Sequence, residues 1–297
     1  MSFFSCEIER GEIMAIHHLF LALIPALGWG MMPILSKIMG GKSEEQLIGT
    51  TIAALLFGLI FSLSQQVTYQ TVSFIICFLS GAFWAVGQYF QFRALEKAEV
   101  SKAMPISVGT QLAFVTLVSG IFLLEWTSIF VAIMSIIALS VILVGILLVT
   151  KTSNNNGKIA KQVIVFLCIS SAFLMLYVTI TSYFDIHGPQ VFLPQSIGMF
   201  VGGMVISMKR IRQLKVNAIA RNIITGCSWV IANTTLFVVS ASLGVGITYS
   251  FSQMSLLVAT YGSIILLREK KTVLEKRSVY LGTLVYVIGV IGMSLLK

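Results

Sequence analysis

Charged residues are scarce in this sequence, and none of its 11 acids lies near the centre of a long apolar run. Asp, Glu, Lys and Arg make up 10% of the 297 residues, whereas a water-soluble domain carries about 25%. This scarcity excludes a soluble protein, and no loop is large enough to form a basic nucleic-acid-binding domain. A carboxylate within a membrane span is the expected mark of a pump for cations or drugs. Its absence favours a neutral ligand.

Signatures of catalysis and of cofactor binding are missing as well. We find no Gly-rich phosphate loop with Lys, no nucleophile elbow and no His and Cys spacing typical of a metal site. The four cysteines share no spacing pattern, and we interpret them as small apolar packing residues. We therefore expect no enzymatic activity, no cofactor, no metal ion and no disulfide.

Long apolar runs fill most of the chain, which is 57% hydrophobic. Lipid offers no partner to backbone groups, so a span of roughly 17–25 apolar residues must be a helix, unless shorter alternating segments form a barrel. The runs are long and continuous, which favours helices. The sequence predicts an all-α integral membrane protein with ten transmembrane helices, at about 17–37, 46–64, 72–94, 103–124, 129–150, 162–184, 190–208, 219–241, 246–267 and 279–296.

The basic residues alternate between loops. All but two of the 20 Lys and Arg residues fall in loops that follow odd-numbered spans, and none falls in a loop that follows an even-numbered span. Positive loops stay in the cytoplasm. We therefore expect a multi-pass protein of the cell membrane with cytoplasmic odd-numbered loops and both termini outside. The net charge of +9 then reports orientation rather than a nucleic-acid partner.

Two stretches in the two halves of the chain are related at an offset of 145 residues. GAFWAVGQYF (81–90) and GCSWVIANTT (226–235) each begin with Gly, have Trp three residues later and an amide four residues after the Trp. Each half has five spans, an odd number, so two tandem copies must lie inverted in the membrane. Corresponding loops of inverted repeats lie on opposite sides of the membrane. The basic residues agree with this, because loop 7–8 carries five of them and its counterpart, loop 2–3, carries none.

We therefore expect two inverted five-helix repeats, at 14–150 and 162–297, joined by a polar cytoplasmic linker at 151–161. Inverted repeats are typical of secondary transporters, which bind substrate near the middle of the bilayer and work by alternating access. The polar N-terminal tail, 1–13, is assigned no function. Met14 is an alternative start of translation, because the apolar pattern begins just after it.

The repeated Trp and amide share one helix face in each half, because they are four residues apart. A buried amide without a partner costs about 1–3 kcal/mol. An indole ring packs against the C–H face of a sugar and an amide bonds its hydroxyls, so the pair suits a polyhydroxylated ligand. The alternative is hydrogen bonding between helices. With other polar residues of the spans, the candidate substrate-binding residues are Trp29, Trp84, Gln88, Gln111, Gln195, Trp229, Asn233 and Gln253.

Residues that could couple transport to protons are harder to identify. Lys37, Glu125 and His187 are the candidates, but each lies near a membrane border. An interfacial anchor or a solvated side chain is the simpler interpretation of Glu125 and His187.

Several stretches, each weakly specific alone, form a more specific set: ALGWG (26–30), GGKSEEQLIGTT (40–51), GAFWAVGQ (81–88), MPISVGTQL (104–112), LPQSIGM (193–199), TYSFSQ (248–253) and LREKK (267–271). In this set the chain, from Met14 onward, resembles the glucose/ribose porter family of sugar-uptake proteins, within the drug/metabolite transporter superfamily. The resemblance implies ten helices in two inverted repeats and uptake of a neutral monosaccharide such as glucose or ribose, with protons. Superfamily members that expel cationic drugs carry a Glu in the first span, and this chain has none there.

Two alternatives stay open at this point. One is an exporter of neutral metabolites or amino acids from the same superfamily. The other is a membrane-embedded sensor without a transport cycle. The sequence names neither the sugar, the coupling ion nor the oligomeric state.

Overall fold

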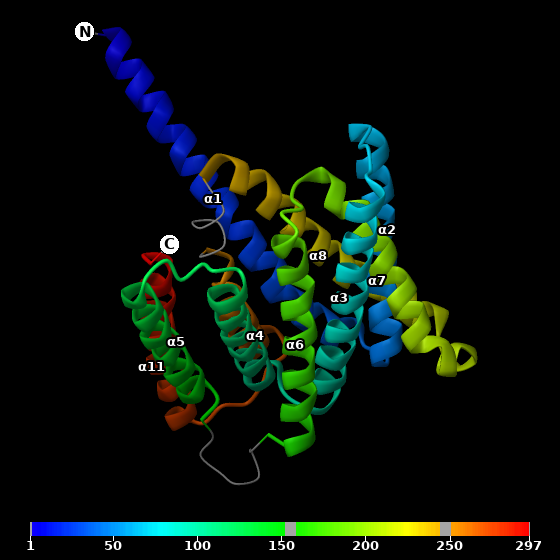
Figure 1. Cartoon of the computed structure of the whole chain (residues 1–297). Helices are drawn as coiled ribbons and strands as arrows, with labels where there is room; N and C mark the ends of the chain where they lie inside the picture. The colour runs from blue at the N-terminus through cyan, green and yellow to red at the C-terminus, as the bar shows by residue number, and fades with distance from the viewer. Residues whose placement is uncertain (1, 152–158, 244–250, 297) are drawn as a thin grey trace.

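The computed structural model describes residues 2–151, 159–243 and 251–296, which form a bundle of long helices joined by short connections (Figure 1). Within these residues there are ten α-helices and no β-strand. Residues 152–158 of the expected linker lie outside the described part. The helices are α1 (Ser2–Met39), α2 (Ser43–Gln65), α3 (Thr71–Lys97), α4 (Val100–Phe122), α5 (Ile129–Val149), α6 (Lys161–Tyr183), α7 (Phe192–Ser207), α8 (Val216–Leu243), α10 (Ser255–Leu266) and α11 (Val273–Ser294).

Nine helices of the described part are long and apolar enough to cross a membrane. Their bounds follow the expected spans: the third was expected at 72–94 and is Thr71–Lys97, and the fifth was expected at 129–150 and is Ile129–Val149. The ninth expected span, 246–267, differs, because α10 is a shorter apolar helix and residues 244–250 lie outside the described part. The prediction of an all-helical, multi-pass membrane protein is confirmed, with nine candidate spans.

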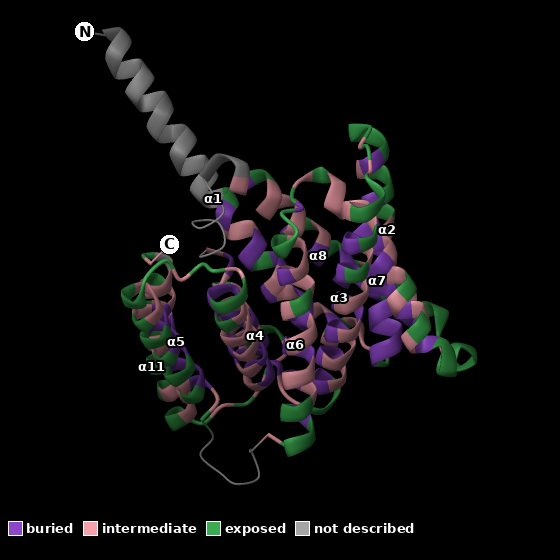
Figure 2. Cartoon of the chain, in the orientation of Figure 1, coloured by how far each residue is buried: buried purple, intermediate pink, exposed green. Residues whose placement is uncertain are grey.

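Large apolar side chains are exposed on the outside of the bundle. Figure 2 shows that much of α5 and α11 is exposed or intermediate. Phe130 and Leu147 in α5 are 68% and 69% exposed. In lipid such faces need no burial, since acyl chains are as apolar as leucine. The interior instead holds small polar residues, and Ser80, Ser170 and Thr225 are all fully buried. This distribution is the one expected of a bundle that meets lipid on its outer side.

Each helix of the first half packs mainly on helices of the second half. Helix α3 packs against α6 and α7, and α8 packs against α1 and α2. Helices α4 and α6 are in contact, as are α1 and α10, and the pairs α2–α7 and α4–α10 meet across the centre. Helices α5 and α11 lie side by side at one edge (Figure 1).

The glycines that open the two related stretches allow two of these close approaches. A Cβ at Gly81 of α3 would overlap the backbone oxygen of Gln195 in α7. A Cβ at Gly226 of α8 would lie 2.5 Å from the backbone oxygen of Thr50 in α2. Small residues at such crossings let helix backbones meet, which is how membrane helices gain packing energy. The repeated Gly is therefore explained by packing.

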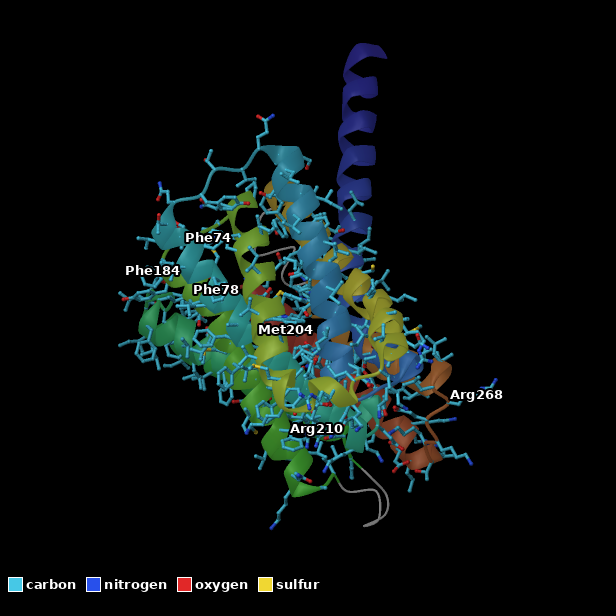
Figure 3. The ribbon with its side chains drawn as sticks, turned by 90° about the vertical axis from the view of Figure 1, so that its right-hand side faces the viewer. Phe74, Phe78, Phe184, Met204, Arg210 and Arg268 are labelled. Carbon is cyan, nitrogen blue, oxygen red and sulfur yellow. The ribbon has the colours of Figure 1, made fainter. Side chains whose placement is uncertain are left out.

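The two ends of the bundle differ in charge. We call the end where α3 ends and α4 begins the basic end, because the loops with Lys42, Lys97, Arg210 and Arg268 lie there, and the opposite end the neutral end. Arg210 and Arg268 project at one end in Figure 3, whereas Phe74 and Phe184 lie toward the other. The basic loops therefore gather at one end of the bundle.

Candidate functional site

A central cavity of about 140 Å³ lies between α1, α3, α4, α6 and α8 and the residues around the start of α10. Its wall contains no charged residue. A buried water needs roughly 10–15 Å³ of such space, so the cavity has room for a small polar molecule rather than one or two waters. Three tryptophans and four glutamines line it: Trp29, Trp84, Trp229, Gln88, Gln91, Gln111 and Gln253.

The two repeated tryptophans meet at this cavity. The rings of Trp84 in α3 and Trp229 in α8 are 5.4 Å apart between centroids and cross at 64°. An edge-to-face arrangement of this kind is favourable for aromatic rings. Both side chains are nearly inaccessible from outside, at 2% and 6% exposure, although they line the cavity. Trp29 of α1 adds a third ring to the wall.

The amide of Gln88 is held by a chain of hydrogen bonds. Its Nε2 donates to Oε1 of Gln91 at 2.8 Å, and Nε2 of Gln91 donates to Oγ of Ser107 in α4, also at 2.8 Å. All three residues are buried. Both hydrogen bonds are needed, because an amide in an apolar span must find partners. Sequence reasoning identified Gln88 but missed Gln91, since a single amide in an apolar helix forms no pattern.

Helix α6 joins this chain of hydrogen bonds through Ser171. Its Oγ donates to the carbonyl oxygen of Ser107 at 3.0 Å and is 2.6 Å from Oγ1 of Thr110. Pro105 and Gly109 lie in this part of α4, and the Ser171 hydroxyl of α6 supplies an additional bond to its backbone. The polar chain thus connects α3, α4 and α6 beside the central cavity.

Six of the eight predicted substrate-binding residues line the central cavity. Gln111 and Gln253 are among them, although their spacing departs from the 145-residue offset. Gln195 does not line it, because its Nε2 donates to Oγ of Ser80 at 2.9 Å between α7 and α3. Asn233 does not line it either, and its Nδ2 donates to the carbonyl oxygen of Trp229 in its own helix. The six that line it are Trp29, Trp84, Gln88, Gln111, Trp229 and Gln253.

None of the three predicted coupling residues lines the central cavity. Glu125 is exposed in the connection between α4 and α5. His187 is exposed near the neutral end, with Nε2 3.1 Å from a carboxylate oxygen of Asp185. Lys37 lies in a depression at the basic end that Glu96, Lys97, Glu99 and Glu269 also line. Within the described residues, no group of three or more acidic, His and Cys side chains could hold a metal ion.

Carboxylates at the basic end tie the two halves of the chain together. Glu269, which follows α10, accepts hydrogen bonds from the backbone N–H groups of Val100 and Ser101 at 2.7 and 3.1 Å. Glu45 of α2 accepts one from the backbone N–H of Lys215 at 2.7 Å, just before α8. An anion at the N-terminus of a helix is stabilised by the free N–H groups and the helix dipole. Each carboxylate therefore caps a helix of the other half.

An ion pair adds a third link between the halves at this end. Nζ of Lys271 lies 3.0 Å from a carboxylate oxygen of Glu99, and Lys102 lies 2.9 Å from the same atom. Partial burial would by itself raise the pKa of Glu99, but hydrogen bonds from Lys102 and Lys271 outweigh it and hold the pKa below its ordinary value. The carboxylate is therefore charged at neutral pH.

A buried apolar layer separates the central cavity from these charges. It consists of Ile34 in α1, Leu95 in α3, and Val100 and Ala103 in α4, each 1% exposed or less. These residues lie close to the ends of their helices at the basic end. Buried side chains therefore lie between the central cavity and the basic end.

Comparison with known proteins gives a consistent result. The family model described as sugar transport protein matches residues 20–296. The chain belongs to the sugar transport protein family. Membership points to a transporter rather than an enzyme.

Several named relatives align over nearly their whole length. A putative sugar uptake protein of Listeria monocytogenes is 39% identical over 282 residues, with 93% of this chain and 98% of the relative covered. The glucose uptake proteins GlcU of Staphylococcus xylosus and Bacillus subtilis are 35% and 34% identical over 284 residues, with 94% of this chain and 98% of each relative covered. A solved crystal structure superposes with a TM-score of 0.65 at 14% identity, covering 94% of this chain and 98% of the other, which shows a shared fold.

Proposed function

We propose that the protein is a secondary transporter that takes up a neutral monosaccharide such as glucose or ribose. The observation that carries the proposal is the composition of the central cavity, which offers indole rings and carboxamides and no charge. A cationic or anionic substrate would leave its charge without a partner in such a site. A sugar, in contrast, has C–H faces that pack on indole rings and hydroxyls that both donate to and accept from amides. The sugar-uptake names of the relatives support the same substrate class.

We infer that the two halves are inverted repeats. Exchanging α1–α5 for α6, α7, α8, α10 and α11 turns the α3–α6 and α3–α7 contacts into the α8–α1 and α8–α2 contacts. The same exchange turns the α4–α6 contact into the α10–α1 contact. Gly81 against α7 and Gly226 against α2 follow this rule, and Trp84 and Trp229 contact each other. A two-fold relation between the halves explains all of these pairings.

The proposed mechanism is alternating access. The links through Glu269, Glu45 and Lys271 join the two halves at the basic end, so one half cannot rock away from the other there without breaking them. In this conformation the sugar enters the central cavity from the neutral end. Binding energy and thermal motion then open the basic end, and the sugar leaves on that side. The basic end faces the cytoplasm of a cell-membrane protein by the positive-inside rule.

Coupling to protons stays a prediction. Of the three candidate residues, only Lys37 lies among several facing charges, those of Glu96, Glu99 and Glu269. A proton that binds in this depression would change the charges beside the links that join the two halves at the basic end. We retain Lys37 as the residue to test, and Glu125 and His187 as exposed residues expected to be dispensable.

Transport of radiolabelled sugar into proteoliposomes tests the proposed function. The panel contains glucose, ribose, a neutral amino acid and an anionic sugar. We expect uptake of at least one neutral sugar, and a loss of about ten-fold in apparent affinity for Gln88→Ala, which removes a cavity amide. Asn233→Ala is the matched control, because it removes the corresponding amide of the other half outside the central cavity. Transport of the amino acid alone would favour the exporter, and transport of nothing would favour the sensor.

A further inference from the structure

We infer that Glu125 does at the neutral end what Glu269 does at the basic end, which is to join the two halves of the chain. The inference rests on the proposed function, because it needs inverted repeats and alternating access. In the conformation described, the Glu125 carboxylate is exposed and forms no hydrogen bond or ion pair with another described residue. It acts in the opposite conformation, in which the basic end is open. This role is separate from coupling to protons, for which we expect Glu125 to be dispensable.

The ends of α4 and α10 carry the same residues at an offset of 144. The stretches LAFVTLVSGIFLLE (112–125) and LLVATYGSIILLRE (256–269) share six identical positions, and each ends in a glutamate. Thr116 and Ser119 are buried in α4, and the corresponding Thr260 and Ser263 are buried in α10. The offset differs by one residue from the 145 of the two tryptophans. Glu125 and Glu269 are therefore equivalent residues of the two halves.

The two helices also end in the same backbone conformation. Leu124 and Arg268, each directly before its glutamate, have φ values of 55° and 54°. A left-handed residue commonly ends a helix, but it is usually glycine, and a residue with a Cβ is strained there. The N–H groups of Leu123 and Leu267 each donate to the carbonyl oxygen four residues earlier, at 3.1 and 3.0 Å. Both glutamates thus leave their helices in the same direction, but at opposite ends of the bundle.

At the basic end this geometry produces a link between the halves. Glu269 accepts from the backbone N–H groups that begin α4, and Oγ of Ser263 also donates to it at 3.2 Å. Exchanging the halves directs Glu125 to the segment before α10, where residues 244–250 lie outside the described part. A rocking motion that separates two repeats at one end brings them together at the other. The link of Glu125 therefore forms when that of Glu269 is broken.

The neutral end has no other acid to replace Glu125 in this role. At an offset of 145, the linking carboxylate of Glu45 corresponds to Gln190. Glu99, which pairs with a lysine at the basic end, corresponds to Gly244. The conformation that is open at the basic end thus depends on a single carboxylate. Removal of its charge shifts the equilibrium toward the described conformation.

The test is labelling of one cysteine by a membrane-impermeant maleimide, applied to inside-out vesicles without sugar. Ala103, in the buried apolar layer, is changed to Ala103→Cys in a chain whose native cysteines are replaced, so that it reacts when the basic end opens. We expect Glu125→Gln to slow labelling about 10-fold, because the minor, open conformation loses a hydrogen bond to a charged group. A substitution that merely loosened the bundle would make labelling faster.

Asp185→Asn is the matched control, because it removes another exposed carboxylate that follows a helix at the neutral end. At the offset of 145 it corresponds to Gly40, which has no side chain to form a link, so labelling should change by less than about 2-fold. Combining Glu125→Gln with Glu269→Gln should return labelling to within about 3-fold of the parent, since each conformation then loses one link.

A labelling rate that Glu125→Gln leaves within about 2-fold of the parent, or raises, would overturn the inference. Labelling needs no sugar, so this result is independent of the transport assay. Absence of transport of every neutral sugar would instead overturn the proposed function, while slower labelling in Glu125→Gln would still show the role of this carboxylate.

Discussion

The substitution Glu269→Gln should open the basic end of the bundle. In the structure the two carboxylate oxygens of Glu269 accept from the backbone N–H groups of Val100 and Ser101 at 2.7 and 3.1 Å. A glutamine keeps one acceptor but turns an NH₂ group toward the second N–H, and the negative charge at the start of α4 is lost. A hydrogen bond to a charged group contributes about 1.5–3 kcal/mol. Losing about 2 kcal/mol from the closed conformation raises the population of the open one about 30-fold, while it is still a minor state.

The assay is chemical modification of a single cysteine in the apolar layer. Ala103, fully buried between the central cavity and the basic end, becomes Ala103→Cys in a variant whose native cysteines are replaced. A membrane-impermeant maleimide then reacts only when the basic end opens. We expect slow labelling with Glu269 present and labelling about 10- to 30-fold faster with Glu269→Gln, in line with the shift in population.

The matched control is Glu275→Gln. The Glu275 carboxylate also accepts from a backbone N–H, that of Thr272 at 2.8 Å, but within the first turn of its own helix, α11. This bond lies within one helix, so labelling should change by less than about 2-fold, as for a local cap. Equal labelling of Glu269→Gln and the wild type, with both proteins folded by thermal melting, would refute the role of these carboxylates in closure.

Three further predictions concern packing, pH and coupling. Gly81→Ala should lower thermal stability in detergent by about 1–3 kcal/mol or prevent folding, because its Cβ overlaps α7, whereas Gly292→Ala, with 3.8 Å to its nearest neighbour, should be nearly neutral; equal melting of the two would contradict the packing argument. Because the pKa of Glu99 is lowered on folding, the carboxylate contributes fully to stability above its ordinary pKa of 4.5, and this contribution is lost as the pH falls through the lowered pKa. The melting temperature of Glu99→Gln should therefore depend less on pH in that acidic range. An unchanged profile would contradict the link to Lys271. An imposed inward proton gradient should stimulate sugar uptake by the wild type and not by Lys37→Met; equal stimulation of both would exclude Lys37 from coupling.

The spans were predictable from the sequence because length and apolar composition are enough to identify a membrane helix. The expected bounds of α3 and α5 agree with the structure to within a few residues. The ninth expected span, 246–267, can be compared only where the structure describes it, and there α10 is Ser255–Leu266 with polar residues before it. Hydropathy averages over a window and cannot place a boundary in a mixed segment.

The related stretches of the two halves predicted a site only in part. Their glycines are explained by helix approach and their tryptophans meet, but of their amides Gln88 lines the central cavity and Asn233 does not. The links at the basic end were not predictable, since Glu269 and Val100 are separated by 169 residues and nothing local relates them. A capping carboxylate has a sequence signal only when it lies within its own helix, as Glu275 does.

The most direct test of the central claim is a fluorescence titration of the Trp126→Phe variant. This variant keeps three of the four tryptophans, and all three line the central cavity. We predict a saturable change in emission with glucose or ribose, weakened about ten-fold in apparent affinity by Gln88→Ala and unaffected by Asn233→Ala. A response to none of a panel of neutral monosaccharides, together with a saturable response to an amino acid, would contradict a sugar site between the two halves.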